Sequence, residues 1–276
     1  MLNTIVFSKD RPMQLEACLR SFFLYAPKEF GNVLILWTSS KPEFKKGYEK
    51  VIKQYKKPNV SFVEEEPTKS SFKQNVQQGF IDENPMSMFL VDDIIFKAPF
   101  SFDDLAFKTV LEDPEVLCLS LRLWIGIDYC YPTKMQIRFP TLEHSNGFVK
   151  FNWKGAEGDW GYPMSIDGHV FKTPLLKKVV EVLDFHNPNG FEGAMSHMAN
   201  LGFLNHLPKM ACYGGESKLL NIPANRVQDV VMNRHGNLIT PEDLNTQFLQ
   251  GKRINVEAYK GFPNRSPHIE LHLRME

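Results

Sequence analysis

Short apolar runs alternate with segments of helical periodicity along the first third of the chain. Strands are predicted where β-branched and aromatic residues cluster, at residues 3–8, 33–37, 60–63 and 88–91. Helices are predicted where apolar side chains recur every three or four positions, at residues 12–23, 43–55 and 70–81. This alternation is typical of βαβ units, so we expect an α/β fold whose mostly parallel central sheet is flanked by helices.

After Asp93 strands and helices no longer alternate regularly along the chain. Further helices are predicted at residues 103–111, 174–183, 191–203 and 241–250, and further strands at residues 116–121, 210–213 and 218–222. The segment through Trp160 is loop-rich and aromatic, and we expect it to form the pocket of a second substrate. The tail from Asn255 contains Pro263 and Pro267 and is expected to be extended. No flexible linker interrupts the chain, so we expect a single domain over residues 1–276.

Two adjacent carboxylates, Asp92 and Asp93, lie between apolar runs in the segment 88–96. Open α/β sheets bind ligands beyond the carboxyl ends of such strands, and two neighbouring carboxylates favour a cation between them. Oxygen ligands select Mg²⁺ or Mn²⁺, which are often shared with substrate phosphates. The pattern therefore predicts a metal-bound diphosphate, although an Asp pair after a strand is also common in turns and helix caps.

The composition and charge of the chain argue against nucleic-acid-binding and membrane-spanning proteins. The chain has 276 residues, 43% of them hydrophobic, with 32 Lys and Arg against 32 Asp and Glu. This balance gives no field that would attract nucleic acid or an anionic membrane. Charges already appear at Lys9, and no apolar run approaches the roughly 20 residues of a membrane span, so a cytoplasmic location is expected. The four cysteines form no CxxC pair, and three of them lie in apolar runs and are predicted to be core residues.

The segment Ser8-Lys9-Asp10-Arg11-Pro12 after the first strand, followed later by Leu90-Val91-Asp92-Asp93, resembles GT-A glycosyltransferases of the family 2 type over residues 3–97. The resemblance implies a GT-A-like nucleotide-diphospho-sugar transferase fold in which an acidic DxD motif holds Mn²⁺ or Mg²⁺ against the diphosphate of the donor. Here the two acids are adjacent, and Ile94 stands where a third acid is often found. Asp92 and Asp93 are the expected metal ligands, and either could make the direct contact.

The same resemblance suggests which residues contact the donor. The loop after the first strand points to Ser8, Asp10 and Arg11, and the helix before the acidic strand points to Asn75. Asp92 is expected to contact the donor as well as the metal. The alternatives are that Asp10 only caps a helix and that Arg11 lies on the surface.

In the second half of the chain, the same resemblance implies the remaining candidates. Glu192, at the start of a predicted helix, is the expected general base, with Asp159 in reserve; the alternative for Glu192 is a favourable interaction with the helix dipole. Arg226 is expected to neutralise the leaving diphosphate. His235 is a candidate third metal ligand, although a lone His is more often structural. Trp160, and less so other tryptophans, could stack against a sugar or pack in the core.

Together these features predict a metal-dependent, inverting glycosyltransferase that uses a nucleotide diphosphate donor, with UDP as the expected nucleotide, and a carbohydrate or glycoconjugate acceptor. Residues 1–97 form the expected nucleotide-sugar half, residues 98–253 the acceptor-binding and catalytic half, and residues 254–276 the tail. Two alternatives remain: a non-catalytic carbohydrate-binding or nucleotide-binding protein of the same fold, and a nucleotidyltransferase. The latter normally needs a glycine-rich phosphate loop, and residues 8–12 contain no glycine.

Overall fold

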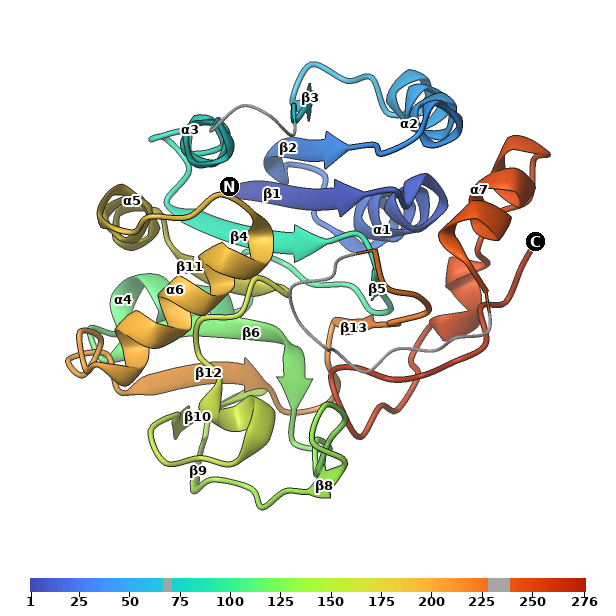
Figure 1. Cartoon of the computed structure of the whole chain (residues 1–276). Helices are drawn as coiled ribbons and strands as arrows, with labels where there is room; N and C mark the ends of the chain where they lie inside the picture. The colour runs from blue at the N-terminus through green and yellow to red at the C-terminus, as the bar shows by residue number, and fades with distance from the viewer. Residues whose placement is uncertain (67–70, 228–238) are drawn as a thin grey trace.

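A large mixed sheet forms the centre of the computed structural model, which describes residues 1–66, 71–227 and 239–276 (Figure 1). Within these residues the sheet has nine strands in the order β3-β2-β1-β4-β11-β6-β12-β10-β9. Strands β11 and β10 run antiparallel to their neighbours, and the remaining strands share one direction. The α/β class and the mostly parallel sheet flanked by helices, which the sequence predicts, are confirmed.

The first half of the sheet matches the predicted elements closely. Its strands are β1 (Leu2–Lys9), β2 (Gly31–Thr38), β3 (Val60–Glu64) and β4 (Met86–Val91), and they are parallel to one another. The connecting helices are α1 (Pro12–Tyr25), α2 (Pro42–Gln54) and α3 (Phe72–Gln78). Strands β1 and β4 are buried on both faces, which explains their unbroken apolar sequences.

The second half contains several strands that the sequence analysis does not predict. Strand β11 (His169–Lys172), which the pattern does not predict, lies between β4 and β6 (Val116–Trp124) in the middle of the sheet. Strand β10 (Phe148–Asn152) lies in the segment that was expected to be loop-rich. It pairs with β12 (Lys209–Tyr213) and with the edge strand β9 (Leu142–His144). The expectation of an irregular segment through Trp160 is therefore wrong for these strands.

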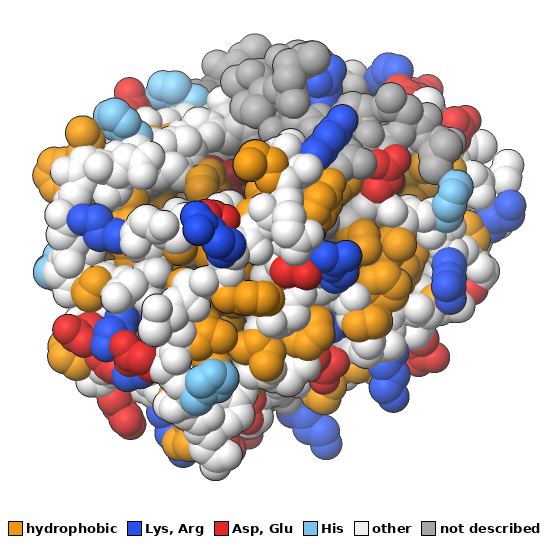
Figure 2. Space-filling model, turned by 90° about the horizontal axis from the view of Figure 1, so that it is seen from below, with side chains coloured by type: hydrophobic (Ala, Val, Ile, Leu, Met, Phe, Trp, Pro, Cys, Tyr) orange, Lys and Arg blue, Asp and Glu red, His pale blue; other side chains and the backbone are white. Residues whose placement is uncertain are grey.

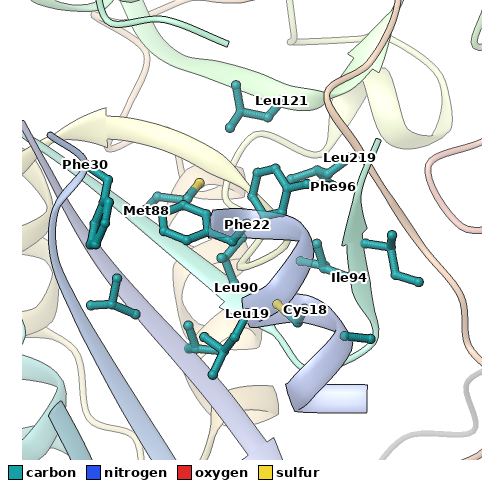
Figure 3. Packing of buried hydrophobic residues seen from close by; sticks show 14 of the residues in the cluster. Cys18, Leu19, Phe22, Phe30, Met88, Leu90, Ile94, Phe96, Leu121 and Leu219 are labelled. Carbon is teal, nitrogen blue, oxygen red and sulfur yellow. The ribbon is translucent and has the colours of Figure 1, made fainter. Parts of the chain in front are cut away.

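Two helical layers cover the two faces of the sheet. Helices α1, α2, α4 (Leu105–Glu112) and α7 (Pro241–Leu249) pack on one face, and α3, α5 (Thr173–Val182) and α6 (Pro188–Asn200) pack on the other. Figure 3 shows part of the first interface, where Phe22 of α1 lies close to Phe30 and Phe96. Burying an aromatic side chain of this size contributes about 1.5–3 kcal/mol to stability.

Several short elements complete the fold beside the main sheet. Strand β5 (Ile94–Phe96) pairs with β13 (Leu219–Asn221), and β7 (Tyr129–Cys130) pairs with β8 (Met135–Gln136). The 3₁₀ helices are η1 (Gly158–Gly161) and η2 (Val256–Tyr259), and the chain after η2 forms turns and isolated bridges without a further helix or strand. The predicted extended tail therefore begins with a helical turn.

The surface and the cysteines agree with the compositional analysis. Positive and negative side chains are intermingled on the face that Figure 2 shows, with apolar side chains between them. All four cysteines are unpaired and buried, including the three that were predicted to be core residues. None of the described helices combines the length and the hydropathy that a membrane crossing requires.

Candidate active site

A cavity of about 460 Å³ lies where β1 and β4 end. The carboxyl ends of parallel strands lie at the same edge of a sheet, and open α/β sheets bind their ligands at that edge. Acidic side chains at the cavity are Asp93, Asp159, Asp167 and Glu192, and basic ones are Arg11, Arg122, Arg226 and His268. The cavity therefore combines groups that can accept protons with groups that can hold phosphate.

Asp92 directly follows β4 and is only 3% exposed. Its Oδ2 accepts hydrogen bonds from Ser8 Oγ at 2.8 Å and from the Lys9 amide at 3.3 Å, and its Oδ1 accepts one from Arg11 at 3.0 Å. Burial raises the pKa of Asp92, and the positive charge of Arg11 acts in the opposite direction. Asp92 is thus a buried anchor that ties the end of β4 to the end of β1.

Asp93 lies next to it and borders the cavity. Its Oδ1 accepts a hydrogen bond from Asn221 Nδ2 at 3.2 Å, and its Oδ2 lies 3.5 Å from Arg11 Nη1. Burial raises the pKa of Asp93 to about 6, partly offset by Arg11. Of the predicted acid pair, Asp93 is the member that faces the ligand space.

Arg11 joins this acid pair to the segment that follows β13. Its Nε donates to Asn225 Oδ1 at 2.9 Å, and its Nη2 donates to the Asn225 carbonyl oxygen. Gln14 Nε2 donates to the same Oδ1 at 3.2 Å. The alternative of a surface arginine is therefore wrong, because this guanidinium bridges three parts of the chain and its side chain is 11% exposed.

The expected metal site can be tested against these contacts. Arg11 Nη1 lies within 3.0 Å of Asp92 and 3.5 Å of Asp93, which is the position expected for the divalent ion. His235 lies outside the described residues, and within the described ranges no three His, Cys, Asp or Glu side chains form a metal-binding group. A divalent ion would have to share this space with a guanidinium of like charge. The donor set does not fit a metal chelated by Asp92 and Asp93.

A second ionic cluster lines the opposite wall. Arg122, in β6, is 1% exposed and donates to Asp159 Oδ1 at 3.0 Å and to Asp167 Oδ2 at 3.2 Å. His268 Nε2 lies 3.2 Å from the same Asp167 oxygen. Burial alone would raise the pKa of Asp167, but His268 and Arg122 outweigh it and lower that pKa. Asp159, the reserve base, is therefore already paired with a cation.

Glu192 projects from α6 into the cavity. Its Oε1 accepts hydrogen bonds from Ser165 Oγ at 3.0 Å and from the Ile166 amide at 3.1 Å. Burial, reinforced by the negative charge of Asp167, raises the pKa of Glu192 to about 7. The helix itself is capped by Asn187, whose side chain accepts from the Gly190 amide at 2.8 Å. Glu192 lies beyond the first turn of α6, so the alternative of a first-turn interaction with the helix dipole is wrong, and its carboxyl group borders the cavity.

The other residues that were predicted to contact the donor do not all border the cavity. Ser8 Oγ lies 2.7 Å from Tyr48 Oη, behind Asp92, and Asp10 Oδ1 accepts from the Ser40 amide at 2.7 Å instead of capping α1. Asn75, on α3, hydrogen-bonds with Glu65 and does not border the cavity. Arg226 does border it.

The tryptophans pack away from the cavity. Trp160 is fully buried, contacts Phe151 edge-on and donates its Nε1–H to the Ile127 carbonyl oxygen at 3.0 Å. The suggestion of a sugar-stacking Trp160 is therefore wrong. Tyr131 and Tyr162 are the aromatic residues that line the cavity.

Three residues of the site escaped the sequence analysis. Arg122 had a usable signal, because an arginine inside the apolar run of residues 116–124 must be paired. Asp167 lies beside Gly168, in a segment that carries no periodic pattern. His268 comes from the tail, and no local spacing connects it to residues a hundred positions earlier.

Comparison with known proteins identifies a curated relative that aligns with nearly the full chain. No protein-family model matches the chain. The bifunctional glycosyltransferase pgtA of Dictyostelium discoideum is 27% identical over 286 aligned residues, which cover 94% of this chain and 36% of pgtA. The chain thus spans about a third of the length of this curated relative.

Solved structures are more distant. TarS of S. aureus covers 79% of this chain and 36% of its own, with 13% identity and a TM-score of 0.46. The mannosyltransferase PcManGT of Pyrobaculum calidifontis, in complex with GDP-Man and Mn²⁺, covers 78% and 58%, with 11% identity and a TM-score of 0.41. A 4-diphosphocytidyl-2C-methyl-D-erythritol synthase of Anaerococcus prevotii covers 90% and 96%, with 12% identity and a TM-score of 0.39.

At these TM-scores the likeness is too distant to indicate a substrate. The relative in Dictyostelium, in contrast, aligns with nearly the full chain. The resemblance to glycosyltransferases predicted from the sequence is confirmed by this homologue.

Proposed function

We propose that this chain is a glycosyltransferase that moves a sugar from a nucleotide diphosphate donor to a hydroxyl group of a carbohydrate or glycoconjugate, with inversion at the anomeric carbon. UDP is the first nucleotide to test. The observation that carries the proposal is one cavity in which Glu192, with a pKa raised to about 7, faces a set of arginines. The homology to a glycosyltransferase supports the same reaction class.

Glu192 is the proposed general base. Its carboxylate takes the proton of the acceptor hydroxyl while that oxygen attacks the anomeric carbon, and the bond to the diphosphate oxygen breaks with its electron pair. A base is most effective when its pKa lies near the working pH. The hydrogen bonds from Ser165 and Ile166 hold one carboxylate oxygen in place, so the other can point to the acceptor.

Negative charge develops on the diphosphate as the bond breaks. Arg226 borders the cavity and is the proposed partner of that charge, because guanidinium groups form charge-assisted hydrogen bonds with phosphate oxygens. Arg11 and Asn225 mark the side of the cavity at which the nucleotide end is proposed to lie. Asp159, held by Arg122, is proposed to position the sugar and not to act as the base.

A panel of nucleotide-diphospho-sugars tests the reaction class. We expect slow release of nucleoside diphosphate from at least one donor, followed by proton NMR, which also reports the anomeric configuration of the first-formed sugar product. Glu192→Gln keeps the size and the amide contact but removes the base, so release should fall by about a hundredfold or more while donor binding persists.

Glu181→Gln is the matched control, because Glu181 is exposed on the neighbouring helix α5 and should change neither quantity. Retention of the anomeric configuration would contradict the role of Glu192. Failure to bind or cleave any donor would contradict the proposed function as a whole.

A further inference from the structure

The acid pair at the end of β4 already has a cation. Arg11 Nη1 lies 3.0 Å from Asp92 Oδ1 and 3.5 Å from Asp93 Oδ2. Charge-assisted contacts of this kind are the strongest hydrogen bonds that a protein offers a carboxylate. The two side chains that resemble a metal-binding motif are therefore joined through a guanidinium.

Arg11 is fixed from its far side as well. Its Nε and Nη2 donate to the side chain and backbone of Asn225, and its own amide donates to Tyr48 Oη at 3.1 Å. Gln14 holds the same Asn225 oxygen at 3.2 Å. To move away from Asp92 and Asp93, Arg11 would therefore have to break its contacts with both carboxylates and also those with Asn225, in the segment after β13.

We propose that Arg11 is the permanent counter-ion of Asp92 and Asp93, and that this chain binds its nucleoside diphosphate without a divalent metal. The inference deepens the function proposed above and rests on it for the identity of the ligand. It replaces the metal dependence that the sequence motif implies.

The remaining charges of the cavity agree with this assignment. The diphosphate needs positive partners, and Arg11, Arg122 and Arg226 all border the cavity. Arg122 Nη1 and Nη2 are held by Asp167 and Asp159, so its guanidinium is fixed at the cavity. The carboxylates of the acid pair are engaged: Asp92 accepts from Ser8, Lys9 and Arg11, and Asp93 accepts from Asn221.

Direct titration with Mn²⁺, followed by the electron paramagnetic resonance signal of the free ion, tests the inference without any turnover. We expect the wild-type chain to bind no more Mn²⁺ than Asp93→Asn does. Arg11→Met removes the charge at similar length, and we expect it to gain Mn²⁺ affinity by about tenfold or more because a like charge is gone. Arg11→Lys keeps the charge and should behave as the wild type.

Calorimetric titration with UDP supplies the second readout. We expect the dissociation constant of the wild type to be the same in EDTA and in excess Mn²⁺, and that of Arg11→Met to rise in EDTA. Arg138→Met is the matched control, because Arg138 pairs with Glu157 on the exposed surface and should alter neither titration. Circular dichroism of each variant checks that it folds.

Stoichiometric binding of Mn²⁺ by the wild type, or UDP binding that requires Mn²⁺, would overturn the inference while leaving the proposed transferase intact. Failure of the proposed function can likewise be told apart from failure of this inference. A wild type that binds neither UDP nor any other donor nucleotide would count against the proposed function, whereas the Mn²⁺ titration alone would still decide whether Arg11 excludes the ion.

Discussion

Glu192 combines two features that a catalytic base needs. It is partly buried near Asp167, which keeps its carboxyl group protonated to higher pH than in water, and it borders a cavity large enough for a sugar. The hydrogen bonds from Ser165 and Ile166 favour the charged form and limit the shift. The result is a group that changes protonation state near neutrality.

We therefore expect kcat/KM for donor turnover to rise with pH and to reach half of its plateau near pH 7, the pKa of Glu192. The rate depends on the deprotonated form, so it falls on the acid side. The measurement is a pH–rate profile from about pH 5 to about pH 9. A half-maximum near the ordinary value of 4.5 for a glutamate would contradict the assignment.

The raised pKa of Glu192 also affects the free energy of unfolding, with a pH dependence opposite to that of activity. Its pKa is higher in the folded than in the unfolded chain, so the folded state binds the proton more tightly. Its contribution to the free energy of unfolding is largest below pH 4.5 and is lost as the pH rises to about 7. Activity and this part of stability thus have opposite pH dependence.

The sequence predicts a residue of the site where that residue lies in a recognisable local motif. Asp92, Asp93 and Glu192 each follow or begin a recognisable element, and Asp93 and Glu192 border the cavity. The partner of the acid pair was not predictable, because either a metal ion or Arg11 can satisfy two carboxylates. Which of them does so depends on Asn225, more than two hundred residues further along the chain.

At the scale of elements, a glycine allows three helices to meet. Gly47 of α2 faces Pro12 at the start of α1 and Asn245 of α7. Asn245 Nδ2 donates to the Glu43 carbonyl oxygen at 2.9 Å, which fixes α7 against α2. A Cβ at position 47 would overlap the side chains of Pro12 and Asn245.

We expect Gly47→Ala to lower the free energy of unfolding by about 2 kcal/mol, because the overlap costs more than the gain in helix propensity. Gly193→Ala in α6 is the control, since a Cβ there meets nothing within 4 Å. That variant should be more stable by about 1 kcal/mol. Urea unfolding measures both, and equal effects of the two substitutions would show that the helix junction is not tightly packed.

Elements were predictable from periodicity in the first half of the chain and less so in the second. Strands β1, β2 and β4 are apolar runs that are largely buried on both faces, which is a strong signal. Strand β11 has only four residues, and two of them are His169 and Lys172. Its place in the sheet comes from pairing with β4 and β6, which no local pattern contains.

At the scale of the whole molecule, the C-terminal segment closes the site. The Asn221 amide donates to the Pro267 carbonyl oxygen at 2.9 Å, and the Ile269 amide donates to the Asn221 carbonyl oxygen at 3.0 Å. These bonds hold His268 beside Asp167. Because Asn221 also contacts Asp93, strand β13 connects the tail with the acid pair.

We expect His268→Ala to lower the free energy of unfolding by about 2 kcal/mol at pH 6, since a charge-assisted hydrogen bond is lost. Burial alone would lower the pKa of His268, but Asp167 outweighs it and raises that pKa above 6.5. The contribution is complete below pH 6.5 and is lost as the pH rises through the folded-state pKa.

Urea titrations at several pH values measure this loss. His272→Ala is the control, because His272 is exposed in the same segment and should have little effect at any pH. If both variants lose equal stability, or if the effect of His268→Ala does not shrink at alkaline pH, the ion pair with Asp167 does not stabilise the tail.

The pairing of residues 267–269 with Asn221 has an engineering consequence. Through these bonds His268 borders the cavity, apart from the strands that are proposed to position the nucleotide. If the proposed transfer is correct, exchanging residues 267–269 between related proteins should alter the side of the cavity next to Asp167 and leave Arg11 and Asn225 unchanged.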